Sequence, residues 1–258
     1  MKKIVKIGLW GAIVAAVTAV VAYLLRSKII QYWLHLTPPE HRVAVEEGVM
    51  VRMRDGVFLA TDHYIPATAD SAPTILVRTP YGRGGRTGLM SRFYGHRFAE
   101  RGYHVVIQDV RGRFESEGEI FEPFVYEAQD GYDTIAWLRT KPWFNGEIGL
   151  WGASYLGYAQ WALMSQDVPE VKAIVPITTE SNLGNAPDES LLLDNILRWM
   201  LILDVQVDQN VSALERYRTI SNAAYQNQLI SNAVSHLPVQ EVDKVMLNKR
   251  MPFFEVWN

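Results

Sequence analysis

The pattern of hydrophobic and polar positions changes twice along the chain. An uninterrupted apolar run comes first, segments with period-two alternation or short apolar runs follow, and segments with apolar residues three and four apart come last. Period-two alternation is typical of strands, and the longer spacing is typical of helices. The pattern predicts three parts: a membrane anchor with a juxtamembrane segment (1–40), an α/β core (41–183) and a helical cap region (184–258).

The first part holds 18 uncharged, mostly apolar residues from Gly8 to Leu25, with basic residues on both sides. As a helix this run would be about 27 Å long, close to the hydrocarbon thickness of a bilayer. We expect a single-pass N-terminal anchor. More basic residues precede the run than follow it, which favours a main domain outside the cytoplasm. Secretion after cleavage of a signal peptide is the alternative.

The middle part alternates predicted strands and helices. Val43–Met53 and residues 57–65 flank a turn at Asp55 and Gly56, which predicts an antiparallel hairpin. Strands are then predicted at Thr74–Thr79, Tyr103–Val110, Ile148–Trp151 and Val171–Ile177, and helices at Met90–Arg101, Glu127–Arg139 and Tyr155–Ser165. Such alternation predicts an α/β fold with a mostly parallel sheet and helices on both faces.

Strand signals stop after Glu180. Leu191–Leu203 and Ala213–Val234 have helical spacing, so we expect a helical cap. The sequence ends in the apolar stretch Phe253–Trp257 without a closing strand. We therefore expect a sheet that is incomplete at its C-terminus.

Composition excludes several kinds of chemistry. The chain has no cysteine, which rules out a thiolate nucleophile, disulfides and cysteine-based metal sites. A net charge of -3 and a pI near 6.1 provide no field for binding nucleic acid. A catalytic site in this chain would use oxygen or nitrogen groups.

A serine lies where a predicted strand meets a predicted helix. Gly152 precedes Ser154 by two positions, as in the nucleophile elbow of serine hydrolases, but Leu156 stands where the usual pattern has a second glycine and Gly157 comes one position later. The start of the next helix makes the Tyr155 N–H a candidate oxyanion donor. An ordinary glycine-rich turn with a capping serine is the alternative.

Several segments together resemble the X-Pro dipeptidyl-peptidase and cocaine-esterase family of α/β-hydrolases, also called CocE/NonD hydrolases. That family's elbow is glycine, any residue, serine, tyrosine, any residue, glycine, which is the spacing found here. The resemblance covers about residues 44 to 180 strongly and the helical remainder loosely. It is carried by Met53–Asp62, Arg78–Tyr81, Asp109–Arg113, Asp130–Thr134 and Gly146–Gly157.

The resemblance implies an α/β-hydrolase fold and cleavage of an ester or amide through an acyl-enzyme at Ser154, without a cofactor or metal. It assigns the oxyanion hole to the Tyr81 hydroxyl and the Tyr155 backbone N–H. The expected substrate is a small-molecule ester, an amide or a short peptide, and the elbow is more similar to the esterase branch. Arg111 and Arg113 are expected to brace loops. Oligomeric state is left open.

The acid and histidine of a catalytic triad have no clear counterpart. In this fold they follow the serine, and His236 is the only histidine after Ser154. We expect His236 in a surface loop and Asp194, Asp204 and Asp208 on helix surfaces. His96 and His104 precede the serine, and His104 is expected near the start of its strand.

Three hypotheses remain. The chain is an incomplete serine hydrolase that is inactive by itself, a non-catalytic membrane-tethered binding protein with a hydrolase-like scaffold, or a hydrolase completed by another polypeptide. They differ in whether Ser154 reacts covalently and in whether that reaction needs further residues of the same chain or a second polypeptide.

Overall fold

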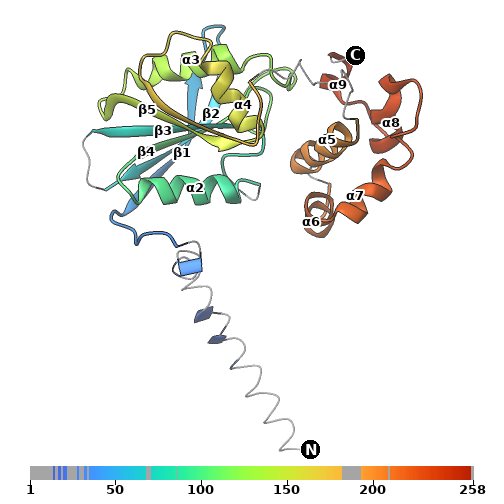
Figure 1. Cartoon of the computed structure of the whole chain (residues 1–258), viewed down its shortest axis with the longest axis horizontal. Coiled ribbons are helices and arrows are strands. Elements are labelled where there is room, and N and C mark those ends of the chain that lie inside the picture. Colours follow the sequence, from blue (N-terminus) through green and yellow to red (C-terminus); the bar gives the residue numbers. More distant parts are fainter. Residues whose placement is uncertain are drawn as a thin grey trace, which may run out of the picture. The chain divides into compact units, whose positions relative to one another are not determined.

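The computed structural model describes residues 35–67, 71–85, 87–181, 193–208 and 210–256, together with a few positions between 14 and 33. The chain divides into two compact units, Met1–Glu40 and His41–Asn258. Figure 1 follows the elements along the chain by colour. The predicted division into three domains stays a prediction.

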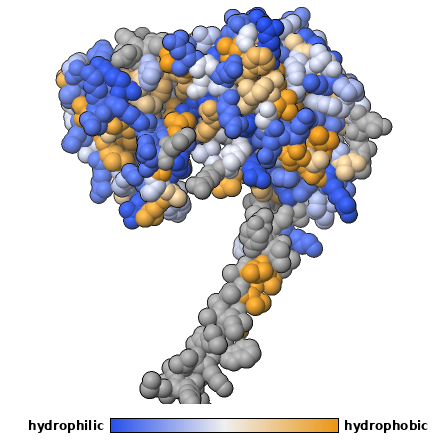
Figure 2. Space-filling model, turned by 180° about the vertical axis from the view of Figure 1, so that it is seen from behind, coloured by the Kyte–Doolittle hydropathy of each residue, from blue (hydrophilic) through white to orange (hydrophobic). Residues whose placement is uncertain are grey.

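The predicted membrane span falls largely outside the described residues. The valines at 14, 17, 20 and 21 are described; they are helical, and their exposed fractions range from 46% to 61%. Figure 2 colours this part of the N-terminal segment as hydrophobic, in contrast to the mixed surface of the second unit. Among the described residues, no helix is both long and apolar enough to cross a bilayer.

A six-stranded sheet forms the centre of the second unit. Its strands are β1 (Val43–Arg52), β2 (Phe58–Pro66), β3 (Ala72–Thr79), β4 (His104–Asp109), β5 (Phe144–Ala153) and β6 (Val171–Ile177). They lie in the order β1-β2-β4-β3-β5-β6. β1 pairs with β2, and β2 with β4, in antiparallel fashion, whereas β4, β3, β5 and β6 are parallel. The predicted hairpin and mostly parallel sheet are confirmed.

Helices cover both faces of this sheet. They are α2 (Leu89–Ala99), α3 (Glu127–Leu138) and α4 (Tyr155–Leu163). Figure 1 shows α2 on one side and α3 and α4 on the other. Within β4, Val105 packs in the same cluster as Ala99 of α2, whereas Val106 packs with Ile135 of α3 and Leu163 of α4. Because both faces are buried, β4 carries a continuous apolar run.

The remaining described chain is helical. It comprises α5 (Leu193–Val207), α6 (Ala213–Ser221), α7 (Ala223–Ile230), a short 3₁₀ turn η1 (Val239–Glu241), α8 (Val242–Leu247) and α9 (Pro252–Val256). The helical spacing predicted over Ala213–Val234 corresponds to two helices, α6 and α7. Asn222 adopts an extended φ of -121°, and its side chain accepts the Tyr225 N–H at 3.1 Å, so it caps α7 and separates that helix from α6.

Candidate active site

Ser154 lies in the sharp turn between β5 and α4. Its backbone angles are φ 55° and ψ -122°, in a region that costs a non-glycine residue about 1–2 kcal/mol. Its N–H donates to the carbonyl of Ile177 in β6 at 2.9 Å, and its carbonyl accepts the N–H groups of Gly157 and Tyr158 at 2.8 and 3.0 Å. The surroundings thus hold an exposed serine in a strained conformation, which is the geometry of a nucleophile elbow.

Two glycines make this turn possible. Gly152 has φ 150°, and a Cβ added there would lie 2.4 Å from the Cβ of Leu156. A Cβ on Gly157 would lie 2.5 Å from Cγ2 of Thr179. Leu156 therefore packs over the first glycine, and α4 approaches Thr179 most closely one position later. This explains why the second glycine stands at 157.

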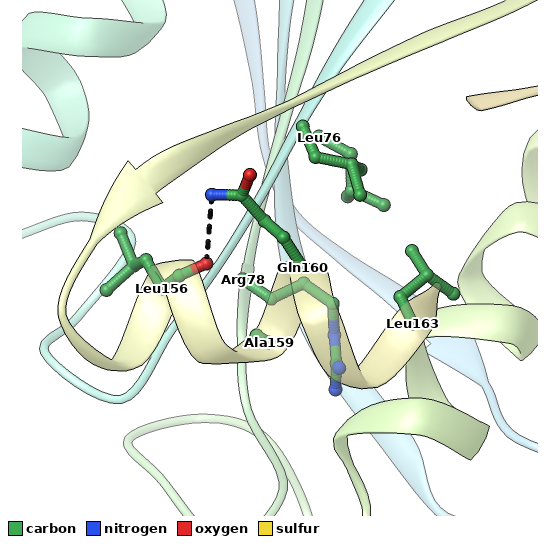
Figure 3. A pocket seen from close by; sticks show the side chains of 7 residues that line it. Leu76, Arg78, Leu156, Ala159, Gln160 and Leu163 are labelled. Atoms are coloured by element: carbon green, nitrogen blue, oxygen red, sulfur yellow. Dashed lines mark hydrogen bonds between the residues drawn. The ribbon is translucent and has the colours of Figure 1, made fainter. Parts of the chain in front are cut away.

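A buried amide beneath α4 holds the turn against two strands. Gln160 Nε2 donates to the carbonyls of Gly152 and Leu156 at 3.2 Å each, and Gln160 Oε1 accepts the Val175 N–H at 2.9 Å. Figure 3 shows the Gln160 side chain between α4 and the sheet, with its amide nitrogen bonded to Leu156. One side chain thereby connects the ends of β5 and β6 to the helix that carries the serine.

Tyr81 follows the C-terminal end of β3, and its side chain reaches the serine. Its hydroxyl accepts the indole N–H of Trp199 at 3.1 Å, and Tyr81 lines the same cleft as Ser154. Burial raises the pKa of Tyr81, the hydrogen bond from Trp199 lowers it, and the net direction is upward. The phenol therefore stays protonated at neutral pH and keeps one proton to donate.

Tyr155 is the first residue of α4, so its backbone N–H lies outside the helix's own hydrogen bonds. Its buried side chain donates to Glu127 and accepts the Phe124 N–H at 3.2 Å. Burial raises the pKa of both the Tyr155 phenol and the Glu127 carboxyl. The side chain fixes the start of α4, which leaves the backbone N–H as the group of Tyr155 able to act on a ligand.

Tyr81, Ser154 and Tyr155 line one cleft of about 390 Å³. The structure thus brings the three predicted site residues together, and their catalytic roles stay predictions. Three aromatic residues of this cleft, Phe124, Tyr158 and Trp199, were not predicted, because apolar spacing along a helix or loop does not show which side chain faces a ligand. The other lining residues are Thr178, Thr179, Glu180 and Asn195.

Among the described residues that line this cleft, none is a histidine. His236 is partly exposed in a turn, with its Nε2 3.7 Å from Glu241, as expected for a surface loop. Asp194 pairs with Arg198 on the exposed surface of α5. The surface position predicted for Asp204 was wrong: it is only 9% exposed and pairs with a lysine at 2.6 Å, because α5 is covered on that side.

The described ranges contain no cluster of histidine and carboxylate side chains suited to a metal ion. His96, which precedes the serine, is half-buried on α2. His104 is the first residue of β4, as predicted, and lies at the amino-terminal end of that strand. Neither of these two histidines lines the cleft of Ser154.

Arg111 and Arg113 brace loops, as predicted. Arg111 donates to both carboxylate oxygens of Asp130, at 2.6 and 3.1 Å. Arg113 donates to the carbonyl of Pro80 at 2.9 Å and to that of Leu203 at 3.2 Å. The second arginine thus joins the segment before the cleft tyrosine to α5.

The chain is similar to known proteins over much of its length. A family model described as X-Pro dipeptidyl-peptidase (S15 family) matches residues 55–257. Cocaine esterase from Rhodococcus sp. (strain MB1 Bresler) is 38% identical over 165 residues, which are 62% of this chain and 29% of that protein. The chain therefore spans less than a third of the length of this curated relative.

Two solved structures are also similar. An α-amino acid ester hydrolase is 33% identical, with 55% of this chain and 27% of that chain covered and a TM-score of 0.46. A CocE/NonD family hydrolase from Staphylococcus aureus is 27% identical, with 51% and 27% covered and a TM-score of 0.45.

Proposed function

Because the chain belongs to the X-Pro dipeptidyl-peptidase (S15) family, we propose that it carries the nucleophile of a serine hydrolase that cleaves esters or amides. The observation that carries this proposal is the strained, exposed Ser154, which shares a cleft with the Tyr81 hydroxyl and the Tyr155 N–H. Backbone strain at an exposed residue that lines a cleft is typical of functional sites.

The proposed reaction has two steps. Ser154 Oγ attacks the carbonyl carbon of the substrate, and its proton passes to a general base, while the carbonyl oxygen becomes an oxyanion that accepts hydrogen bonds from Tyr81 Oη–H and Tyr155 N–H. The intermediate collapses, and the alcohol or amine leaves with the proton. Water then attacks the acyl-serine in the same way and releases the acid. Neither step uses a cofactor.

The base and its acid are not assigned among the described lining residues of the cleft. We propose that they lie on further chain, and that residues 1–258 alone are inactive. Removal of one triad member typically costs several orders of magnitude in turnover. A non-catalytic binding scaffold tethered to a membrane is the competing function.

Labelling with a fluorophosphonate probe tests the proposal. The probe is applied to the 258-residue chain, to the chain extended by its downstream coding sequence, and to the Ser154→Ala form of each. We expect labelling in the extended chain only, and its loss in Ser154→Ala. Ser165→Ala, at an exposed serine in the turn after the same helix, is the matched control and keeps the label. Absence of Ser154-dependent labelling from both chains contradicts a hydrolase and favours the binding scaffold.

Glu180 supports a second candidate, cleavage of substrates that carry a free amine. It is the single acidic side chain among the described lining residues of the cleft, and it is exposed. A carboxylate there attracts an ammonium group over a few ångströms. Paired esters with and without an α-amino group distinguish the two. Glu180→Gln is expected to raise KM for the amino ester alone, whereas equal effects on both esters contradict amine recognition.

We propose that the N-terminal unit anchors the protein in a membrane, with the main domain outside the cytoplasm. The apolar run at 8–25 and its basic flanks support an anchor, as do the exposed valines between positions 14 and 21. The full chain is expected in the membrane fraction after alkaline washing, and a chain beginning at residue 41 in the supernatant. Release of the full chain by the wash, or a shortened N-terminus by mass spectrometry, contradicts a retained anchor and favours a cleaved signal.

A further inference from the structure

The acceptor side of the Tyr81 hydroxyl is occupied by a group from another part of the fold. The indole nitrogen of Trp199, on α5, lies 3.1 Å from Tyr81 Oη. An indole N–H is a donor only, so the phenol oxygen is the acceptor in this contact. A phenol has a single proton. That proton is therefore free for an acceptor in the cleft that Tyr81 shares with Ser154.

We propose that Trp199 is a positioning residue of the oxyanion hole: by donating to Tyr81 Oη, it directs the phenol proton toward the oxyanion formed at Ser154. This inference rests on the proposed hydrolase function. Accepting one hydrogen bond also polarises the phenol and strengthens the bond that it donates. In the absence of the indole N–H, the Tyr81 hydroxyl could rotate and accept a bond from Ser154 instead, which is the wrong direction for oxyanion binding.

The indole ring is held in place by stacked aromatic rings. Trp199 stacks on Phe124, with ring centres 5.8 Å apart and 19° between the planes, and on Tyr155 at 6.1 Å and 26°. Phe253 packs against it at 6.1 Å from the C-terminal side of the helical region. Tyr155 is itself anchored through its hydroxyl to Glu127. The Trp199 ring therefore packs on Tyr155, whose backbone N–H is the second proposed oxyanion donor.

A second contact fixes the spacing between α5 and the tyrosine. Arg113 is 5% exposed and donates to the carbonyl of Pro80, directly before Tyr81, and to that of Leu203 on α5. The guanidinium joins the two segments that carry the hydrogen-bonded pair. Because both the loop and the helix are tied to one rigid group, the distance between Trp199 and Tyr81 does not depend on their own contact alone.

Trp199→Phe tests the inference, because it keeps an aromatic ring for stacking and removes the N–H. Its matched control is Trp161→Phe, at a tryptophan of α4 that is 37% exposed and lies outside the cleft. The first readout is the pKa of 3,5-difluorotyrosine placed at position 81, followed by ¹⁹F NMR. A hydrogen bond to the oxygen stabilises the phenolate, so its loss is expected to raise that pKa in Trp199→Phe but not in Trp161→Phe.

The second readout is the rate of fluorophosphonate labelling in the extended chain. Trp199→Phe is expected to slow it about tenfold, the scale of one lost hydrogen bond. In combination with Tyr81→Phe it should cause no further loss, since the indole acts only through the phenol.

The outcomes separate this inference from the proposed function. An unchanged pKa in Trp199→Phe overturns the inference whether or not Ser154 reacts. If the extended chain without substitutions is labelled, and the losses in labelling rate from Trp199→Phe and Tyr81→Phe add up in the double variant, the inference is also overturned, while the hydrolase function stands. If the extended chain without substitutions is not labelled, the hydrolase function is contradicted, and with it any positioning role in catalysis.

Discussion

The two edges of the parallel sheet, at the carboxyl and amino ends of its strands, differ in the exposure and backbone strain of their polar residues. At the carboxyl ends, Ser154 is exposed, and its φ is 55°. At the opposite edge of the sheet, where β4 begins and the antiparallel β2 approaches its end, His104 and His63 are 1% and 2% exposed, hydrogen-bonded to each other at 2.9 Å and stacked on Trp143. The first edge holds an exposed serine in a strained conformation, and the second buries two titratable side chains in regular strands.

This difference indicates where chemistry belongs in the fold. Burial lowers the pKa of His63 to about 3, so the ring stays neutral and packs like an aromatic side chain. A perturbed pKa therefore does not identify a site by itself, since structural groups show it as well. Strain at an exposed residue, with hydrogen-bond donors facing the same cleft, is the stronger indication.

The largest effect is expected from Tyr81→Phe in the extended chain. Loss of one oxyanion donor typically lowers kcat by about 10²–10³-fold, while KM changes little because the donor acts on the transition state. Esterase assays over substrate concentration provide both constants. Tyr158→Phe, in the same cleft but with its hydroxyl 3.4 Å from the carbonyl of Phe124, is the matched control. An unchanged kcat, with a change in KM alone, would contradict the oxyanion role.

Gly152→Ala is expected to destabilise the fold by about 3 kcal/mol, because its Cβ would lie 2.4 Å from Leu156 at a φ of 150°. Gly146→Ala is the control: its φ of 88° is also unfavourable, but an added Cβ meets nothing within 4 Å. We expect a loss of about 1 kcal/mol there. Urea unfolding of both variants measures the difference. Equal losses would mean that backbone angle, and not the packing of Leu156, makes the glycine necessary.

Local patterns predicted much of the fold because burial on both faces gives clear signals. The central strands, the opening hairpin and the helices that follow β3, β4 and β5 were all found in this way. Local patterns did not give every boundary. Asn222 divides the stretch of helical spacing at 213–234 into two helices by capping the second, and β5 begins at Phe144, ahead of the turn-forming pair Asn145 and Gly146.

The candidate site was predictable only in part. Ser154 and Tyr81 stand in local motifs, and the structure places both in one cleft. Trp199 lies 118 residues after Tyr81, and no sequence pattern joins the two. Its place depends on how α5 packs, which follows from long-range contacts such as those of Arg113. Sequence patterns therefore found the strained centre of the site but not the groups that orient it.

The free energy of unfolding is expected to depend on pH through the buried His63. The pKa of His63 is about 3 in the folded chain and 6.5 in the unfolded chain, so between these values the unfolded chain binds the extra proton. Stability is then lost as pH falls below about 6.5, by about 2 kcal/mol between pH 7 and pH 5. Urea unfolding at both pH values measures this loss. His63→Phe should reduce it, and His236→Gln, at a partly exposed position, should not.

The smallest effect is expected from relief of the backbone strain at Ser154. Ser154→Gly removes the Cβ that disfavours a φ of 55° and should raise the free energy of unfolding by about 1 kcal/mol relative to Ser154→Ala. Both variants lack the hydroxyl, so the comparison isolates the backbone, and urea unfolding at pH 7 measures it. If the glycine variant is no more stable than the alanine variant, the turn is not strained. The contrast between the two ends of the sheet would then rest on exposure alone.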